Sequence, residues 1–364
     1  MKAGIVGLPN VGKSTLFNCL SNAKAQSANF PFCTIEPNIG VVNVPDPRLS
    51  KLEELVNPER VIPATVEIVD IAGLVKGASK GEGLGNQFLG NIRETDAILH
   101  VLRCFDNDNV VHVDGSVDPI RDKETIDIEL QLKDLESVEK KADKIGRAAK
   151  TGDKTAQKEF DALSRVKEAL EAGKSVRSLE FDENEYNDYI KPLQLITDKP
   201  VLYVCNVDEG AAVSGNAYVE KVKEAVKDEN AEVLVLAVGT EADINELEDF
   251  EERQMFLEDI GLDEPGSSKL IRSAYKLLKQ QTYFTAGKKE VRAWTTTIGD
   301  TAPQAAGVIH TDFEKGFIRA EVIAYDDYVS YGSEAKVKEA GKMRVEGKNY
   351  VVKDGDVMHF LFNV

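Results

Sequence analysis

The sequence predicts an α/β protein with a mainly parallel sheet, an inserted antiparallel α-helical arm and a small C-terminal α+β domain. Over the first hundred residues, short apolar runs alternate with helical patterns, as in βαβ units. A heptad pattern interrupts this alternation in the middle of the chain, and short strands and turns follow residue 280. The length of 364 residues suits two or three domains at roughly 150 residues each.

The expected strands of the parallel sheet are short and rich in β-branched residues, as is typical of strands buried on both faces. They are Ala3–Val6, Ala64–Val69, Ala97–Leu102, Pro200–Cys205 and Ala231–Val238. A connecting helix is expected near Ser14–Asn22.

The inserted arm is predicted from apolar residues that recur at alternating spacings of three and four. Its first limb carries Leu135, Val138, Ala142, Ile145 and Ala149, and its second carries Phe160, Leu163, Val166 and Leu170. A break at Thr151-Gly152-Asp153 separates the limbs, so the segment is expected to form two helices folded back on each other as a coiled coil. Each limb of about 20 residues would reach about 30 Å.

The C-terminal domain is predicted to begin after a helix over Ser268–Lys279. Its candidate strands are Val291–Thr296, Gly316–Ala324, Tyr350–Val352 and His359–Phe362. The predicted division of the chain is therefore 1–127 with 198–280 for the α/β domain, 128–197 for the arm and 281–364 for the C-terminal domain.

The overall charge restricts the kinds of partner that the protein can bind. The chain carries 45 Lys and Arg against 63 Asp and Glu, a net charge of −18, so contact with RNA requires a local basic patch. Its four cysteines lie far apart and have no metal-site spacing, which favours reduced thiols in a cytoplasmic protein. No uncharged run reaches the roughly 18 residues that span a bilayer, so we expect no membrane partner.

The segment Gly7–Ser14, GLPNVGKS, fits the phosphate-binding pattern G-x-x-x-x-G-K-[ST] between an expected strand and an expected helix. This context predicts the G domain of a P-loop NTPase. Lys13 would bind the β- and γ-phosphates, and the Ser14 hydroxyl would bind Mg²⁺. The backbone amides expected to face the phosphates are those of Asn10, Val11, Gly12, Lys13, Ser14 and Thr15.

Asp70 ends an expected strand and begins the pattern D-x-x-G, which closes at Gly73. Asp70 can hold Mg²⁺ through water, and the Gly73 amide can contact the γ-phosphate. Thr34, in an upstream loop, could supply a second hydroxyl ligand to Mg²⁺. The order of P-loop, threonine and D-x-x-G is that of a switch-type NTPase.

The residue after this pattern is Leu74, where small GTPases often carry the glutamine that orients water. Leucine cannot hydrogen-bond water, so we expect slow intrinsic hydrolysis unless another group supplies this function. His112 follows the strand expected at 97–102 and is a candidate for positioning the water. The alternative for His112 is a solvent-exposed loop residue without a role.

The base is predicted from Asn206-Val207-Asp208-Glu209, where guanine-specific proteins carry N-K-x-D. Val207 replaces the lysine and Glu209 replaces the specificity aspartate. An asparagine can both accept from adenine N6 and donate to N7, and the Val207 carbonyl could also accept from N6. The substitutions therefore favour ATP over GTP, with Val238 and Gly239 in a turn that completes the base pocket.

Four segments together closely resemble the YchF, or Obg-like ATPase, family, and the resemblance covers essentially the whole chain. They are GLPNVGKST (Gly7–Thr15), NFPFCTIEPN (Asn29–Asn38), DIAGLVKGAS (Asp70–Ser79) and the stretch Ala302–Val322. The last segment resembles the TGS domain, a ubiquitin-like β-grasp module. The resemblance implies a translation-factor-class NTPase that prefers ATP, hydrolyses it slowly and associates with ribosomal particles or RNA. It also implies Mg²⁺ binding by Ser14 and Thr34 and adenine contact by the Val207 carbonyl.

The arm is more basic than the rest of the chain. Residues 132–178 contain 12 Lys and Arg against 9 Asp and Glu, a net charge of +3. Five basic residues lie at the tip, where only Asp153 opposes them: Lys144, Arg147, Lys150, Lys154 and Lys158. The tip is a candidate contact for RNA phosphates, and the alternative is an ordinary solvated helical surface.

Two classes of function remain open at this point. The first is an ATPase whose nucleotide controls binding to a ribosome, a ribosomal subunit or RNA, with a GTPase of degenerate base motif as a narrower rival. The second is a nucleotide-sensing module that regulates a protein partner, with hydrolysis incidental. Acceleration of turnover by ribosomes would favour the first class.

Overall fold

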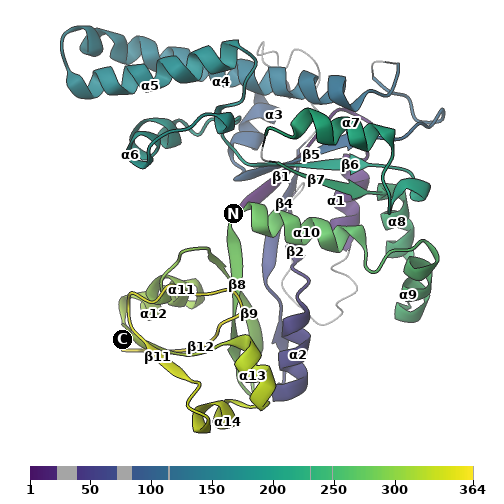
Figure 1. The fold of residues 1–364 in the computed structure, drawn as a ribbon, viewed down its shortest axis with the longest axis vertical. Helices are drawn as coiled ribbons and strands as arrows, with labels where there is room; N and C mark the ends of the chain where they lie inside the picture. Colours follow the sequence, from purple (N-terminus) through teal and green to yellow (C-terminus); the bar gives the residue numbers. More distant parts are fainter. Residues whose placement is uncertain (23–38, 72–83, 114, 230, 248, 364) are drawn as a thin grey trace. The chain divides into compact units, whose positions relative to one another are not determined.

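The computed structural model describes every residue except 23–38, 72–83, 114, 230, 248 and 364 (Figure 1). The chain forms two compact units. Of the described residues, the first unit holds 1–22, 39–40 and 67–270, and the second holds 41–66 and 271–363. Residues 41–66 thus group with the C-terminal part of the chain, although the sequence suggested no such association.

A six-stranded sheet has the order β2-β4-β1-β5-β6-β7, and all of it except the end of β2 and the start of β4 belongs to the first unit. Its strands are β1 (Lys2–Val6), β2 (Ile39–Asn43), β4 (Thr65–Asp70), β5 (Ala97–Arg103), β6 (Val201–Asn206) and β7 (Glu232–Leu236). The pairs β4–β1, β1–β5, β5–β6 and β6–β7 are all parallel, which confirms the predicted α/β class. Every residue of β5 and β6 is buried, as their apolar sequences require.

Helices lie between these strands along the chain and follow the last of them. They are α1 (Lys13–Asn22), α3 (Leu84–Arg93), α4 (Pro119–Lys150), α5 (Lys154–Glu171), α6 (Glu183–Glu185), α7 (Ala217–Val226), α8 (Val238–Glu246), α9 (Phe250–Asp259) and α10 (Gly266–Leu277). Shorter helical turns are Val176–Ser178, Tyr186–Ile190, Lys191–Leu193 and Glu209–Ala211. Among the described residues, no helix is long and apolar enough to cross a membrane.

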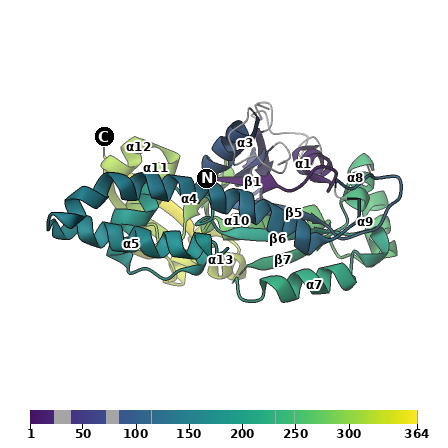
Figure 2. The same ribbon diagram turned by 90° about the horizontal axis from the view of Figure 1, so that it is seen from above.

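The arm is a hairpin of α4 and α5, which lie side by side in both views (Figures 1 and 2). The predicted seam is confirmed, because Val138 of α4 is fully buried against Leu163 and Val166 of α5. Helix α4 is longer than the expected limb: it has 32 residues, about 48 Å. It begins at Pro119, where the Asp118 side chain caps the first turn, so its first nine residues precede the predicted arm boundary.

Asp134 fixes the point where the chain returns from the arm to β6. The side chain is fully buried and accepts hydrogen bonds from the backbone amides of Ile196 (2.9 Å) and Thr197 (2.7 Å) and from the Thr197 hydroxyl (2.7 Å). Burial raises the pKa of Asp134, and these hydrogen bonds act in the opposite direction. Helix α4 and the segment before β6 are therefore held together by one buried carboxylate.

The second unit has a mixed sheet in the order β11-β10-β12-β8-β9-β3. Its strands are β3 (Val61–Ile62), β8 (Gln280–Ala286), β9 (Val291–Thr297), β10 (Phe317–Ile323), β11 (Arg344–Glu346) and β12 (Val357–Phe362). Its helices are α2 (Pro47–Val56), α11 (Ala302–Ile309), α12 (Thr311–Lys315), α13 (Tyr325–Tyr331) and α14 (Glu334–Glu339). Small alanines of α11 pack against Tyr283 and Phe360 of the sheet.

The structure differs from the sequence prediction at several elements. The expected strand Tyr350–Val352 is wrong, because only Val351 forms a single bridge, with Thr301. Strand β7 ends at Leu236, and Val238 begins α8, so the predicted turn at Val238 and Gly239 is the first turn of a helix. The predicted division into 1–127 with 198–280, 128–197 and 281–364 remains a prediction.

Candidate functional site

The loop between β1 and α1 has the backbone conformation that its sequence requires. Asn10 and Gly12 both have positive φ, at 62° and 101°. A Cβ atom on Gly7 would lie 2.6 Å from the Val101 carbonyl oxygen, so only glycine permits this close approach to β5. The loop thus turns sharply and brings the first amides of α1 to the edge where β1 ends, as the motif predicts.

Lys13 is buried at the start of α1, and its Nζ donates to the Leu8 carbonyl at 2.7 Å. Burial lowers the pKa of Lys13 to about 8, while the charge of Asp70 opposes this shift. The ammonium is therefore held within the phosphate-binding loop in an environment that penalises its charge. A polyphosphate would supply the missing negative charge.

Asp70 lies at the end of β4, next to the P-loop residues. Its Oδ1 is buried and has no hydrogen-bond partner among the described residues. Burial raises the pKa of Asp70, while the charge of Lys13 and a hydrogen bond with the Ser14 side chain lower it. Ser14 itself is exposed. A free carboxylate oxygen beside a hydroxyl is a ligand set that suits Mg²⁺, which prefers oxygen and keeps several waters.

The remaining predicted residues of the phosphate and metal site lie outside the described part of the chain. These are Thr34, Gly73 and Leu74. Within the described residues, no group of three or more His, Cys, Asp or Glu side chains is placed to hold a metal. A cation at Asp70 would accordingly take further oxygens from phosphate and water.

Asn206, at the end of β6, joins the P-loop to the start of α8. Its Nδ2 donates to the Val11 carbonyl at 2.9 Å, and its Oδ1 accepts from the Val238 amide at 3.0 Å. Ala237, the residue before α8, has no capping side-chain hydrogen bond, so Asn206 supplies the cap from another strand. Each polar group of this amide makes one hydrogen bond within the protein, and the expectation that Asn206 reads adenine stays a prediction.

The other residues predicted for the base pocket follow Asn206 or lie at the start of α8. Val207 is buried, and its amide donates to the Leu236 carbonyl at 3.0 Å. Within the described part of the chain, no hydrogen bond uses the Val207 carbonyl. Glu209 is exposed in a short helical turn capped by the Asp208 side chain. Val207 and the first turn of α8, with Val238 and Gly239, are therefore held in fixed positions.

The loop after β5 contacts the P-loop, a feature that the sequence did not reveal. The Asn10 side chain donates to the Val111 carbonyl at 3.2 Å. Arg103 is almost fully buried, and its guanidinium donates to the carbonyls of Phe105, Asn107 and Val110. One arginine at the end of an apolar strand thus shapes the loop, and that unusual placement is the signal that could have identified it.

His112 is not the exposed loop residue that the sequence allowed. The side chain is buried, and its Nε2 lies 2.8 Å from the Asp122 Oδ2 in the first turn of α4. Asp122 also accepts from Arg121 at 3.3 Å. The structure therefore connects the loop beside Asn10 to the long helix of the arm. Its predicted action on the attacking water stays a prediction.

Two protein families match the chain. The family described as 50S ribosome-binding GTPase matches residues 2–145. The family named for the YchF GTPase C-terminus, described as a protein of unknown function (DUF933), matches residues 280–363. The matched ranges include the P-loop at one end and the second sheet at the other.

Whole-chain similarities agree with these matches. The chain is 58% identical over 363 residues to the Ribosome-binding ATPase YchF of Haemophilus ducreyi, covering 100% of this chain and 99% of that protein. It is 58% identical over 366 residues to the protein of the same name from Bacillus subtilis, covering 100% of both. The Schizosaccharomyces pombe YchF GTPase structure superposes with a TM-score of 0.90 at 38% identity, covering 99% of this chain and 97% of that chain.

The lowered pKa of Lys13 predicts proton uptake on nucleotide binding. In the free protein Lys13 loses its proton as the pH rises through about 8, whereas bound phosphates favour the charged form. Binding of a nucleoside triphosphate at pH 9 should therefore take up about one proton, and binding at pH 7 almost none. Calorimetry in two buffers of different ionisation enthalpy measures this number.

The matched control is Lys13→Arg, because arginine stays charged at pH 9. It should bind nucleotide without proton uptake at either pH. Wild-type binding without proton uptake at pH 9 would contradict the assignment of Lys13 as the phosphate ligand.

Proposed function

The chain belongs to the YchF family, and from that premise we propose a Mg²⁺-dependent ATPase that acts as a nucleotide-controlled switch on the ribosome. The observation that carries the proposal is the grouping of Lys13, Ser14 and Asp70 where β1 and β4 end. One buried oxygen of the Asp70 carboxylate has no hydrogen-bond partner among the described residues. The bacterial relatives named above are ribosome-binding ATPases, and their similarity to this chain extends over its full length.

Each part of the phosphate site has a proposed role. The amides of Asn10 to Thr15 bind the phosphates, and Lys13 exchanges the Leu8 carbonyl for the β- and γ-oxygens. Mg²⁺ is held by the hydroxyls of Ser14 and Thr34 and, through water, by Asp70. Bound there, the ion neutralises charge that develops on the phosphates during transfer. The Gly73 amide reports the presence of the γ-phosphate.

The backbone carbonyl of Val207 is proposed to recognise adenine. Its carbonyl can accept from the adenine N6 amine, and the buried side chain presents an apolar surface to the ring. Asn206 supports this pocket by holding Val11 and Val238 rather than by reading the base with both of its groups. GTP would bind more weakly, because the aspartate that accepts from guanine is replaced by Glu209, which lies exposed.

Hydrolysis is proposed to be slow, because Leu74 cannot orient water. His112 is the candidate for that role. Its Nε2 faces the Asp122 carboxylate, and this contact fixes the orientation of the ring. His112 directly follows Val111, whose carbonyl accepts from the Asn10 side chain of the P-loop.

The arm tip is proposed as the contact with RNA on the ribosome. The five basic side chains at the tip are exposed, and within the described residues none of them forms an ion pair: Lys144, Arg147, Lys150, Lys154 and Lys158. By contrast, Lys141 and Lys167 nearer the base are paired with Glu159 and Glu139. Basic side chains at the tip that have no acidic partner can bind RNA phosphates.

The proposed domains keep the boundaries expected from the sequence. Residues 1–127 with 198–280 form the nucleotide-binding domain, 128–197 the coiled-coil arm, and 281–364 a TGS domain of β-grasp type. The packing of α4 on α5 supports the arm, and the apolar core around α11 supports the C-terminal domain. A ribosome-bound role places the protein in the cytoplasm.

ATP and GTP titrations compare the two candidate substrates directly. We expect tighter binding of ATP, because the Val207 carbonyl accepts from the N6 amine and would repel the guanine O6 at the same place. Fluorescent analogues of both nucleotides, titrated in the presence of Mg²⁺, give the two dissociation constants. Tighter binding of GTP would refute the proposed base pocket and favour the GTPase alternative.

Neutralising the arm tip should weaken ribosome and RNA binding. The triple variant Lys150→Gln, Lys154→Gln, Lys158→Gln removes three unpaired charges, and each lost phosphate contact lowers the slope of log affinity against log salt by about 1. Sedimentation with ribosomes over a series of salt concentrations measures both effects.

A matched control neutralises three exposed lysines, Lys221 and Lys223 of α7 and Lys227 directly after it. This variant loses the same charge from the same unit and should keep the wild-type salt slope. Equal binding by the two variants would show that the tip is an ordinary solvated surface.

A further inference from the structure

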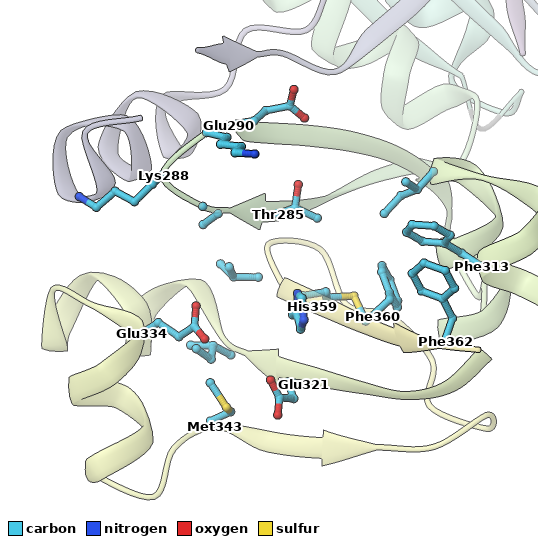
Figure 3. Close-up of a pocket in the computed structure, with 17 residues that line it drawn as sticks. Thr285, Lys288, Glu290, Phe313, Glu321, Glu334, Met343, His359, Phe360 and Phe362 are labelled. Atoms are coloured by element: carbon cyan, nitrogen blue, oxygen red, sulfur yellow. The ribbon is translucent and has the colours of Figure 1, made fainter. Parts of the chain in front are cut away.

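The second unit contains a pocket of about 510 Å³ that the nucleotide site does not use (Figure 3). The β8–β9 hairpin and β12 lie on opposite sides of it. Among the described residues, β12 pairs with β8 only at Val357 and Phe284, where the Phe284 amide donates to the Asp356 carbonyl at 2.8 Å. By contrast, β8 pairs with β9 along its whole length. The pocket therefore lies where β8 and β12 separate from each other.

Beyond that position, one edge of β12 has no strand partner in the part of the chain that the structure describes. Backbone groups alternate in direction along a strand, so Phe360 and Phe362 direct their N–H and C=O groups to the same side as Asp356, away from β10. Within the described residues, no hydrogen bond is made by the backbone of Phe360 or Phe362 on that side. A buried edge of this kind is a template for an added strand.

The hairpin is fixed in its separated position rather than free to close on β12. The Lys288 side chain donates to the Val56 carbonyl at 2.9 Å, and the Glu59 amide donates to the Lys288 carbonyl at 3.0 Å. On its other edge, β9 pairs with β3. Because residues of the same unit hold the hairpin, the pocket is preformed, which lowers the entropy cost of binding.

The two faces of the pocket differ in chemistry. Phe313 stacks on Phe362 with ring centroids 3.7 Å apart and forms an apolar end together with Phe360. On the opposite face of the sheet, His359 is the register partner of Glu321, and Glu334 of α14 lies nearby in the lining (Figure 3). Within the described residues, neither glutamate forms an ion pair.

We propose that this pocket binds an extended, basic segment of a partner polypeptide as a strand added to the free edge of β12. Side chains of an added strand alternate between the two faces, so apolar residues would meet Phe313 and Phe362 while lysines or arginines meet Glu321 and Glu334. The two carboxylates favour a basic polypeptide over RNA. The proposal does not depend on the nucleotide or on the proposed ATPase activity.

The test uses the full-length protein and an eight-residue peptide of alternating lysine and valine. Hydrogen exchange is measured with and without the peptide. Protection of the Phe360 and Phe362 amides is expected, because these N–H groups would donate to the added strand. The same peptide with alternate backbone amides N-methylated should bind at least tenfold more weakly, since it cannot complete the ladder.

Variants separate strand addition from general charge attraction. The double variant Glu321→Gln, Glu334→Gln should weaken binding of the lysine peptide about fivefold. The matched double variant Asp326→Asn, Glu339→Gln removes exposed carboxylates outside the pocket and should bind as the wild type does.

Four results would overturn the proposal. They are no protection of the two amides, equal binding of the N-methylated peptide, equal binding of a peptide with glutamate in place of lysine, and protection of the same amides by an RNA oligonucleotide instead.

Discussion

Helix α4 is continuous from Pro119 to Lys150, and the coupling in the proposed function depends on that continuity. Its first turn carries Asp122, which binds His112 beside the loop that contacts the P-loop. Its last turn carries the basic residues Arg147 and Lys150. A regular helix transmits displacement along its length far better than a loop does, so the two ends cannot move independently. One helix thus joins the arm tip to a loop that contacts the P-loop.

Hydrogen bonds connect the nucleotide-binding loops to the start of this helix. Asn10 donates to the Val111 carbonyl, and the next residue, His112, faces Asp122 of α4. On the other side of the P-loop, Asn206 holds the Val11 carbonyl and the Val238 amide. Phosphates that alter the P-loop would therefore act on both Val111 and the base pocket. Under the proposed function, the bound nucleotide would set the position of the arm through these contacts.

Local patterns made part of this structure predictable. Eight contiguous residues specify the P-loop, and the spacing of three and four specifies the arm, because both depend on neighbours in sequence. The role of Asn206 could not be predicted, since its partners Val11 and Val238 lie 195 and 32 residues away. The length of α4 was underestimated for another reason: its first half packs on the sheet and shows no heptad pattern. Strand β8 was missed because the turn that separates it from α10 consists of Leu278 and Lys279, which are not typical turn residues.

Ribosome affinity with and without a non-hydrolysable ATP analogue tests the coupling through α4 most directly. In the wild-type protein the two affinities should differ by about fivefold or more, a usual range for allosteric coupling. His112→Ala should bind both ligands but bring the ratio close to one, whereas His310→Ala, an exposed histidine of the second unit, should leave it unchanged. A wild-type ratio of one, or an unchanged ratio in His112→Ala, would contradict the account.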